Sequence, residues 1–480
     1  MKGDGPSGLL WTNLEQIERL CRESLRALRD LLGVPLYLTG GLVRSQLLGQ
    51  EAQDADLCAA LPPEDLLTAL RGGGRFLPLR AFPRMGTVVL FDQENRNTFE
   101  YTAFRKEVYP AGGAHTPSEV VFGGSLEEDA LRRDFTVNAL YCEVGSGEIL
   151  DPTGGLPDLK NRVLRTVRAP GEVFAHDGLR LFRLCRFAAQ LGFSLDPDTE
   201  RTAKEVQALA DDISSDRIAI EFLKTLHADS AYPALTKGSF PHYRGLKLWH
   251  AQGLLARFLP ELTAGDGMPQ RGDFHRWDVL EHILQTVRFS HPSVREAALL
   301  HDVAKPFQMI RTGRYRGHDE VGAPMALAIC RDRLKLGRQK SAEVAELVRL
   351  HMVDLDGKTS EKKMKWFVAS HFEILDKLML LKQADFLGCG LQTGECPGNL
   401  RLKRIREELL AAGAPLSRKA LALSGKDLAE AFPALPPSAL SPLLEKLWKM
   451  CVNDPSLNRP DRLLAAAKGV LPPKNIRREP

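Results

Sequence analysis

The stretch LTGGLVRSQLLGQEAQDADLCA, residues 38–59, determines the fold near the start of the chain. An apolar, β-prone run ends at the Gly40–Gly41 pair, and the helix-like LVRSQLL follows. Such a turn lets backbone N–H groups approach a phosphate, and Arg44 on the first helical turn would add positive charge. Taken alone, the turn is equally compatible with an ordinary strand-to-helix connection. As a functional site, it predicts that Gly41 and Arg44 contact a nucleotide.

Two carboxylates follow the turn, Asp54 and Asp56. In a strand, residues i and i+2 point to the same face, so both would project together while Ala55 and Leu57 face the core. Paired carboxylates can hold two Mg²⁺ ions that activate an attacking hydroxyl and neutralise a triphosphate. The alternative is a solvated strand face. Glu100, on another strand pattern (NTFEYTAF), is a candidate third acidic residue.

Three charged residues, Arg132, Arg133 and Asp134, stand directly before the mixed apolar run FTVNALYCEV. Paired arginines bind phosphate oxygens with a geometry that lysine does not match. We therefore assign the three to a nucleotide-binding group. A surface helix end is the alternative.

The segment 177–191 predicts a helix that is mostly buried, because nine of its fifteen residues are apolar. Arg180, Arg183 and Arg186 recur at intervals of three along it, and Asp177 stands one turn before Arg180, where an ion pair could hold the two together. A carboxylate acceptor beside a guanidinium donor can imitate the hydrogen-bonding edge of a base. The helix is thus a candidate nucleotide-selecting element, with an ordinary salt bridge and snorkelling arginines as the alternative.

Histidines concentrate in one region, with six of the twelve between 275 and 351. His282, the His301–Asp302 pair, His318 and His351 lie on or beside helical runs, and Asp385 follows downstream. Imidazole and carboxylate ligands together suit Mn²⁺, Fe²⁺, Ni²⁺ or Mg²⁺, and a bound metal could activate water for phosphoester hydrolysis. The cluster predicts a second metal site.

The pattern of apolar residues predicts an α+β protein. Short β-prone runs fill 34–155, whereas helical patterns dominate from about 160 onward. Gly/Pro/polar segments near 264–273 and 390–399 are candidate seams. We expect a head over 1–155, a helical neck and body over 156–265, a metal-binding helical domain over 266–392 and a helical tail over 393–480.

Composition excludes several classes of protein. With 480 residues, 44% hydrophobic and 26% charged, the chain is neither disordered nor collagen-like nor a coiled coil. Its eight cysteines contain no C-x-x-C pair, which indicates reduced thiols. We find neither a membrane span nor a leader pattern and expect a cytoplasmic protein without membrane partners.

The net charge of +4 is small, but it is unevenly distributed. Residues 160–186 hold seven Lys or Arg residues and two acidic ones. A cationic tract of this kind suits an RNA backbone.

Six ordered motifs together carry a family resemblance: GGLVR (40–44), DAD (54–56), TAFRKEVY (102–109), LRRDFTVNAL (131–140), DPTGG (151–155) and HDGLRLFRLCRFAAQLGF (176–193). In this order and spacing, the chain resembles the class II tRNA nucleotidyltransferase/poly(A) polymerase family. The resemblance implies a polymerase-β-like head followed by helical neck, body and tail. It further implies Asp54 and Asp56 as Mg²⁺ ligands, Gly41 and Arg44 as contacts of the incoming nucleotide, and Arg133 as a contact of its phosphates or ribose.

Two positions depart from the family pattern. The usual Gly-Gly-x-Val-Arg-Asp ends here in Ser45, which cannot supply a carboxylate. The Glu-Asp-x-x-Arg motif, which in the family selects CTP and ATP, begins here with His176 but retains Asp177 and Arg180. The metal pair is unaffected by either departure.

The histidine-rich region resembles the HD phosphohydrolase superfamily. By that resemblance the core metal ligands are His282, His301, Asp302 and Asp385, and His318 and His351 complete a binuclear set. The resemblance implies a divalent transition metal such as Mn²⁺ or Ni²⁺. It also implies 2′,3′-cyclic phosphodiesterase, 2′-nucleotidase or phosphatase activity, as in HD units fused to such nucleotidyltransferases.

We therefore predict a CCA-adding tRNA nucleotidyltransferase with an HD phosphohydrolase domain, whose partners are ATP, CTP and the tRNA 3′ end. Three functions of the same class share every head motif used here: a CC-adding enzyme, an A-adding enzyme and a poly(A) polymerase. An alternative of another class is an HD phosphohydrolase whose head only binds RNA. Protein partners, the HD substrate and the oligomeric state are not indicated by the sequence.

Overall fold

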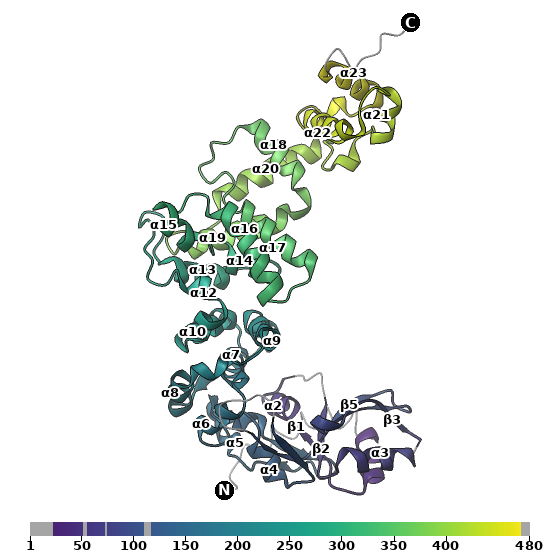
Figure 1. Ribbon diagram of the computed structural model, residues 1–480, viewed down its shortest axis with the longest axis vertical. Helices are drawn as coiled ribbons and strands as arrows, with labels where there is room; N and C mark the ends of the chain where they lie inside the picture. The colour runs from purple at the N-terminus through teal and green to yellow at the C-terminus, as the bar shows by residue number, and fades with distance from the viewer. Residues whose placement is uncertain (1–22, 51–54, 73, 110–116, 472–480) are drawn as a thin grey trace, which may run out of the picture. The chain divides into compact units, whose positions relative to one another are not determined.

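The computed structural model describes residues 23–50, 55–72, 74–109 and 117–471. The chain divides into two compact units. The first comprises residues up to 263 together with 333–335, and the second comprises 264–332 and 336–480. In Figure 1 the strands are confined to the purple and blue part of the chain, and the teal, green and yellow parts are helical.

The first unit is built on a seven-stranded mixed sheet with the strand order β3-β4-β5-β2-β1-β8-β9. Strands β2 and β5 pair in parallel, with Asp56 opposite Glu100, and the other neighbouring pairs are antiparallel. The strands are β1 (Tyr37–Thr39), β2 (Asp56–Ala59), β3 (Phe76–Phe82), β4 (Thr87–Asp92), β5 (Thr98–Ala103), β8 (Tyr141–Glu143) and β9 (Ile149–Leu150). A separate hairpin is formed by β6 (Arg105–Val108) and β7 (Glu119–Phe122).

Short helices connect these strands: α2 (Gly41–Leu47), α3 (Pro63–Arg71) and α4 (Leu126–Leu131). A capping box formed by Ser125 and Glu128 fixes the start of α4. Between strands and loops, Tyr37, Phe104 and Tyr141 form a buried aromatic cluster with edge-to-face contacts. The cluster thus joins β1, the strand that leads into the Gly40–Gly41 turn, to β8.

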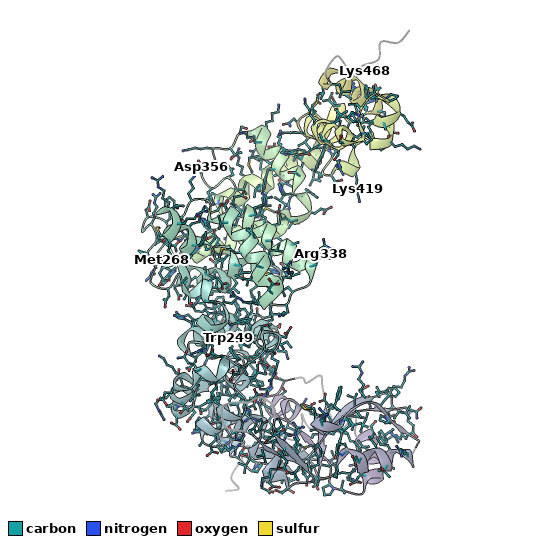
Figure 2. All side chains as sticks on the ribbon, in the orientation of Figure 1. Trp249, Met268, Arg338, Asp356, Lys419 and Lys468 are labelled. Atoms are coloured by element: carbon teal, nitrogen blue, oxygen red, sulfur yellow. The ribbon has the colours of Figure 1, made fainter. Side chains whose placement is uncertain are left out.

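The rest of the first unit is helical: α5 (Gly155–Asn161), α6 (Pro170–His176), α7 (Leu179–Leu191), α8 (Pro197–Glu205), α9 (Ser215–Leu226), α10 (Pro241–Ala251), α11 (Leu254–Phe258) and α12 (Pro260–Thr263). Two short strands, β10 (Val163–Leu164) and β11 (Ser194–Leu195), pair in parallel. Trp249, labelled in Figure 2, is fully buried and packs against Phe182, Phe222 and Phe258. These contacts fix α7 and α9, both of which carry site residues.

The second unit contains α13 (Val279–Phe289), α14 (Arg295–Leu300), α15 (Lys305–Thr312), α16 (His318–Ala328), α17 (Arg338–Leu350), α18 (Glu361–Ser370), α19 (Leu375–Gly388), α20 (Pro397–Ala411), α21 (Gly425–Ala431), α22 (Pro437–Asn453) and α23 (Pro460–Val470). Helices α13 and α19 approach closely at Gly388, where an added Cβ would lie 2.4 Å from the Thr286 hydroxyl. Only glycine permits that approach.

The predicted α+β class is confirmed, because the strands of the main sheet lie before residue 151 and helices follow. The four-part domain division stays a prediction. Within the described residues, no helix is both long and apolar enough to cross a membrane.

Candidate nucleotide and metal sites

The Gly40–Gly41 turn brings a carboxylate and a guanidinium together. Gly40 has φ 69° and ψ −132°, a conformation that only glycine adopts readily. A Cβ at this position would lie 3.5 Å from Oδ2 of Asp56 and 3.6 Å from Nη1 of Arg133. The turn therefore sits directly against two of the predicted site residues.

Two of the three predicted acidic residues of the head occupy matched positions on neighbouring strands. Asp56 on β2 and Glu100 on β5 are direct partners in a parallel pair, so their side chains share a face of the sheet. Leu57, the next residue, is fully buried, as the alternation predicts. Asp54 lies outside the described residues.

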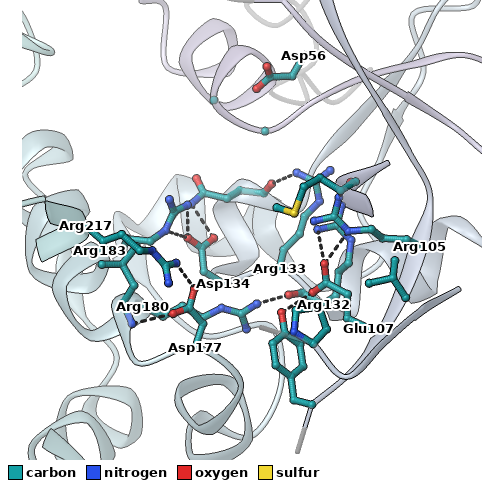
Figure 3. A pocket seen from close by; sticks show the side chains of 18 of the residues that line it. Asp56, Arg105, Glu107, Arg132, Arg133, Asp134, Asp177, Arg180, Arg183 and Arg217 are labelled. Carbon is teal, nitrogen blue, oxygen red and sulfur yellow. Dashed lines mark hydrogen bonds and ion pairs between the residues drawn. The ribbon is translucent and has the colours of Figure 1, made fainter. Parts of the chain in front are cut away.

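A pocket of about 460 Å³ opens beside the turn, and arginines dominate its lining. Figure 3 shows guanidinium and carboxylate groups facing one another across it. The predicted residues that line it are Gly41, Arg44, Asp56, Arg132, Arg133, Asp134, Asp177, Arg180 and Arg183. Further arginines in the lining are Arg84, Arg105 and Arg217. Such a concentration of positive charge suits a triphosphate.

The predicted Arg132–Arg133 pair is organised by Asp129, a residue that sequence reasoning missed. Its buried carboxylate lies 2.6 Å from Arg132 and 3.0 Å from Arg133, and it accepts a hydrogen bond from Tyr141 at 2.8 Å. Burial would raise the pKa of Asp129, but the two arginines hold that pKa below its ordinary value. The carboxylate is therefore ionised and fixes both guanidinium groups.

Asp134 belongs to a second buried network. Arg183 on α7 lies 2.6 Å from its carboxylate, and the Asn138 side-chain amide donates to the same group at 3.0 Å. Burial would raise the pKa of Asp134, yet Arg183 and Asn138 hold it well below the usual range. The residue thus orients Arg183 toward the pocket.

Asp177 and Arg180, which the sequence predicts as an ion pair, line the same pocket, and each also has contacts with other residues. Asp177 ends α6, accepts a hydrogen bond from the Leu179 backbone N–H at 3.0 Å and pairs with Arg217 of α9 at 2.9 Å. Arg180 donates to the backbone carbonyls of Val173 and Arg132. Helix α7 begins at Leu179, so Asp177 lies before the helix and not on it. The ion pair with Arg217 sets the orientation of the Asp177 carboxylate.

Arg186, the last predicted member of the group, is not part of the described lining of the pocket. It forms a buried ion pair with Glu221 and donates to the Gln190 side chain at 2.9 Å. Its guanidinium also lies 3.9 Å from the centre of the Phe187 ring. These contacts give it a packing role between α7 and α9.

Arg44 is 4% exposed and spans from the head to the segment after α9. One nitrogen donates to Tyr232 at 2.9 Å, and another donates to Asn138. The Ser45 hydroxyl lies 3.0 Å from the same Tyr232 hydroxyl. Burial would raise the pKa of Tyr232, but Arg44 and Ser45 lower it overall. At the position that departs from the family, a serine–tyrosine contact thus supports Arg44.

His176, the second departure, lies at the end of α6 and stacks on Tyr109 with ring centres 4.6 Å apart. A nitrogen of Arg168 lies 2.8 Å from its Nδ1. Burial and the charge of Arg168 lower the pKa of His176, so the ring is neutral near pH 7. It therefore adds no charge beside Asp177, where the glutamate of the family motif would add a negative one.

The second unit brings all six predicted ligands into one buried cluster. His282 comes from α13, the His301–Asp302 pair follows α14, His318 begins α16, His351 follows α17 and Asp385 lies on α19. Five of the six side chains are essentially buried, and Asp385 is 18% exposed. The predicted convergence is present in the structure.

Asp302 divides this cluster into two halves. Its Oδ2 lies 3.2 Å from Nε2 of both His282 and His301, and its Oδ1 lies 3.0 Å from Nε2 of His318. Asp385 Oδ1 lies 3.1 Å from His282 Nε2, and His351 Nε2 lies 3.2 Å from His318 Nε2. Ligands that share a cation at about 2.1 Å in adjacent octahedral positions lie about 3 Å apart. The two groups of donors that share Asp302, one with His282 and His301 and the other with His318 and His351, could each hold a divalent cation.

Hydrogen bonds from the far side of the rings orient three of the histidines. Nδ1 of His301, His318 and His351 lies 2.8, 2.8 and 2.6 Å from the carbonyls of Ala298, Tyr315 and Val348, respectively. Each carbonyl fixes the Nδ1–H tautomer and leaves Nε2 free to ligate a metal. Lys305 lies 2.6 Å from Asp302 Oδ2, where it balances the carboxylate charge.

Some supporting residues could have been found in the sequence and others could not. Asp129 lies on α4, and Arg132 and Arg133 follow it by three and four residues just after the helix ends, a spacing that signals side-chain contact. Tyr232 lies 188 residues after Arg44 and Arg217 lies 40 after Asp177, and no local pattern links them.

A carboxylate-bearing pair of strands, a glycine turn and an arginine-lined pocket define a phosphate-binding site of the nucleotidyl-transfer type. Comparison with known protein families supports this type of site. The Poly A polymerase head domain model matches residues 36–165, the model of a probable RNA and SrmB-binding site of polymerase A matches 192–237, and the HD domain model matches 279–387.

Curated relatives establish the family. The A-adding tRNA nucleotidyltransferase of Deinococcus radiodurans is 35% identical over 362 residues, 72% of this chain and 75% of the relative. The multifunctional CCA protein of Chromobacterium violaceum is 34% identical over 312 residues, 62% of this chain and 69% of the relative. The chain belongs to the tRNA nucleotidyltransferase/poly(A) polymerase family, as the motifs predicted, and it carries an HD domain.

A solved structure confirms the same fold over most of the chain. The Bacillus stearothermophilus CCA-adding enzyme in complex with CTP matches with a TM-score of 0.65 at 23% identity, covering 94% of this chain and 97% of that one.

Proposed function

We propose that the chain is a CCA-adding tRNA nucleotidyltransferase, which adds CMP and AMP from CTP and ATP to the 3′ end of tRNA without a nucleic-acid template. The observation that carries the proposal is the pocket in which Asp56, the paired arginines, Asp177 and Arg180 all meet. The pocket combines a proposed metal ligand with arginines that can bind a triphosphate. It also holds a hydrogen-bond acceptor, Asp177, and a donor, Arg180, that could pair with the edge of a base. The names of the curated relatives, A-adding tRNA nucleotidyltransferase and multifunctional CCA protein, support this reaction class.

In this proposal, the triphosphate is bound by the arginines. Arg132 and Arg133, held by Asp129, contact its oxygens, and Arg44 contributes from the turn. Asp54 and Asp56 would hold Mg²⁺, and Glu100 is the candidate third carboxylate. Bound Mg²⁺ supplies activation of the RNA 3′-hydroxyl and neutralises the charge of the leaving pyrophosphate. The 3′-hydroxyl oxygen attacks the α-phosphorus, and pyrophosphate leaves.

Base choice is assigned to Asp177 and Arg180. The carboxylate supplies acceptors and the guanidinium supplies donors, which together match the polar edge of cytosine or adenine. Arg217 holds Asp177, and two backbone carbonyls hold Arg180, so both groups are fixed before a nucleotide arrives. Fixed groups discriminate better than mobile ones, because little ordering entropy is lost on binding.

The name of one relative favours a second candidate, an A-adding enzyme. The test offers tRNA transcripts that end at the discriminator base, at C or at CC, each with CTP, ATP or both, followed by sequencing of the products. Complete CCA ends from the discriminator transcript support the proposal. Extension by A from CC ends alone would establish the A-adding alternative, and long A tails on unrelated RNA would establish a poly(A) polymerase.

For the second unit we propose phosphohydrolase activity, with 2′,3′-cyclic nucleotides as the first substrates to test. The cluster of His282, His301, Asp302, His318, His351 and Asp385 supports it, together with the HD domain match. A bound divalent cation such as Mn²⁺ or Ni²⁺ supplies the activated water and charge neutralisation. If the Mn²⁺- or Ni²⁺-supplemented protein leaves the cyclic nucleotide intact and behaves like His301→Ala, the proposal fails.

We also propose the domain division that the sequence suggested. The head would span 1–155, the neck and body 156–265, the HD domain 266–392 and the tail 393–480. The observed boundary between the two compact units, after residue 263, lies beside the second of these junctions. Limited proteolysis that cuts near residues 264–273 before other segments would support the junction.

A further inference from the structure

The C-terminal end of α19 is fixed against two other segments on the side of the HD cluster next to His282. The Arg276 backbone N–H donates to the Cys389 carbonyl at 2.9 Å, which ties the loop before α13 to the end of α19. Gly388 allows α19 to lie directly against Thr286 of α13. Three side chains that are distant in sequence are thereby held together.

Those three side chains are His275, His282 and Cys389. A ring nitrogen of each histidine and the Sγ atom of Cys389 all lie within 4.8 Å of one another. The two imidazole rings meet edge to face, with centres 4.6 Å apart. Cys389 stands one helical turn after Asp385, so both point to the same side of α19.

Two potential metal-binding atoms of the trio form no hydrogen bond in the described part of the protein. Nδ1 of His282 and Nδ1 of His275 are both buried without a hydrogen-bond partner among the described residues. His282 itself is fully buried. The other three histidines of the HD cluster each direct Nδ1 to a backbone carbonyl. An unsatisfied buried nitrogen costs free energy, which a bound cation would recover.

One ring nitrogen of His282 lies among the side chains of the HD cluster, and the other has no hydrogen-bond partner among the described residues. Its Nε2 is surrounded by His301, Asp302 and Asp385. Its Nδ1 is the atom left over. The HD cluster, moreover, contains only nitrogen and oxygen donors, whereas the neighbouring trio contains sulfur.

We propose that His275, His282 and Cys389 form an additional metal site that binds a thiophilic divalent cation of the Zn²⁺ class. Thiolate and imidazole are the ligands that such cations prefer, and three protein ligands leave one position open. Binding displaces the proton of the Cys389 thiol to solvent. If both centres were filled, the Nδ1 proton of His282 would also be released to solvent.

A cation can reach this trio from solvent. His275 and Cys389 line a cavity of about 870 Å³ that also opens onto Asp302, His318, His351 and Asp385. Both side chains are partly exposed, in contrast to His282. The proposed site is therefore open to exchange with added metal.

The test uses Co²⁺ titration of the metal-free full-length chain, followed by absorption spectroscopy. A thiolate bound to Co²⁺ gives a charge-transfer band in the near ultraviolet, which nitrogen and oxygen ligands do not give. We expect the band in the wild type and its loss in Cys389→Ser, with one Co²⁺ equivalent less by equilibrium dialysis. Cys396→Ser is the matched control, because Cys396 lines the same cavity outside the trio, and it should keep the band.

Three outcomes would overturn the proposal: no band in the wild type, a band that persists in Cys389→Ser, or a band that is also lost in Cys396→Ser. If Cys389→Ser does not fold, His275→Ala provides the second variant, and an unchanged Co²⁺ stoichiometry there contradicts the site. Asp302→Asn separates this proposal from the hydrolase. It should abolish hydrolysis of phosphoesters while the thiolate band remains.

Discussion

The two chemical sites of this protein are built with opposite charges. In the first unit, arginines line the pocket, and buried carboxylates such as Asp129 and Asp134 hold them in place. In the HD cluster, carboxylates and imidazoles crowd around a central Asp302, with Lys305 as the neighbouring cation. The positive charge of the first site favours binding of a polyanion, whereas the carboxylates and imidazoles of the second favour binding of metal cations. Each site should therefore fail for a different reason when it is altered.

The largest expected effect is the loss of one activity with no change in the other. Asp56→Ala should lower nucleotidyl transfer by more than about 10³-fold, because the variant lacks the proposed ligand of the metal that acts on the transition-state charge. Hydrolysis of a 2′,3′-cyclic nucleotide should be unchanged. Asp302→Ala should show the reverse pattern. Transfer and hydrolysis assays on both variants check the prediction, and a loss of both activities in either variant would contradict the independence of the sites.

A second prediction concerns the carboxylate that organises the arginines. Asp129→Ala removes the nearest carboxylate from both Arg132 and Arg133 in a largely buried position, which should destabilise the protein by about 3 kcal/mol. The affinity for nucleotide should fall too, because both guanidinium groups lose their orientation. Denaturant unfolding and nucleotide titration measure the two effects. Tyr141→Phe removes two hydrogen bonds, the one that the hydroxyl donates to Asp129 and the one that it accepts from Arg133, and should cost about 2 kcal/mol. Equal costs would argue against the proposed role of Asp129.

The third prediction uses pH to distinguish a cation-binding cluster from an anion-binding one. Burial would lower the pKa of His282, but hydrogen bonds to Asp302 and Asp385 raise it from 6.5 to about 9 in the metal-free protein. Its stabilising contribution is fully present below pH 6.5 and is lost as the pH rises through about 9. A metal requires the neutral ring, so metal binding strengthens over the same range.

The rise in Tm caused by added divalent metal should therefore be larger at pH 9 than at pH 6.5. Thermal unfolding with Ni²⁺ or with a chelator measures it, and His282→Gln is the control that should weaken the pH dependence. A metal-induced shift of equal size at both pH values would contradict this account.

The smallest predicted effect lies at the position that departs from the family. Tyr232→Phe removes the hydroxyl that contacts Arg44 and Ser45, at a cost of about 1 kcal/mol. We expect the KM for nucleotide to rise roughly fivefold with little change in kcat, because Arg44 is positioned less well. Steady-state kinetics distinguish this from a general loss of stability. Ser45→Asp in the Tyr232→Phe background should restore KM by pairing with Arg44, and no recovery would count against the positioning role.

The sequence predicted the parts of each site that depend on local spacing. Asp56 on its strand and the helix that carries Arg180 and Arg183 follow from periodicity, and the HD ligands follow from a resemblance to a known pattern. The partners of these residues were not predictable. Asp177 pairs with Arg217 from another helix, and Arg44 contacts Tyr232 far along the chain. Tertiary packing brings these residues together, and no local sequence pattern indicates it. The contact between Gly388 and Thr286 is another case, since it depends on how α13 and α19 pack.

The most direct test of the central claim is extension of a tRNA transcript that ends at the discriminator base, with CTP and ATP together and Mg²⁺ present. We predict products that end in CCA with the wild-type chain and no extension with Asp56→Ala. A wild-type chain that leaves this transcript unextended, or an Asp56→Ala variant that still completes CCA, would contradict the account.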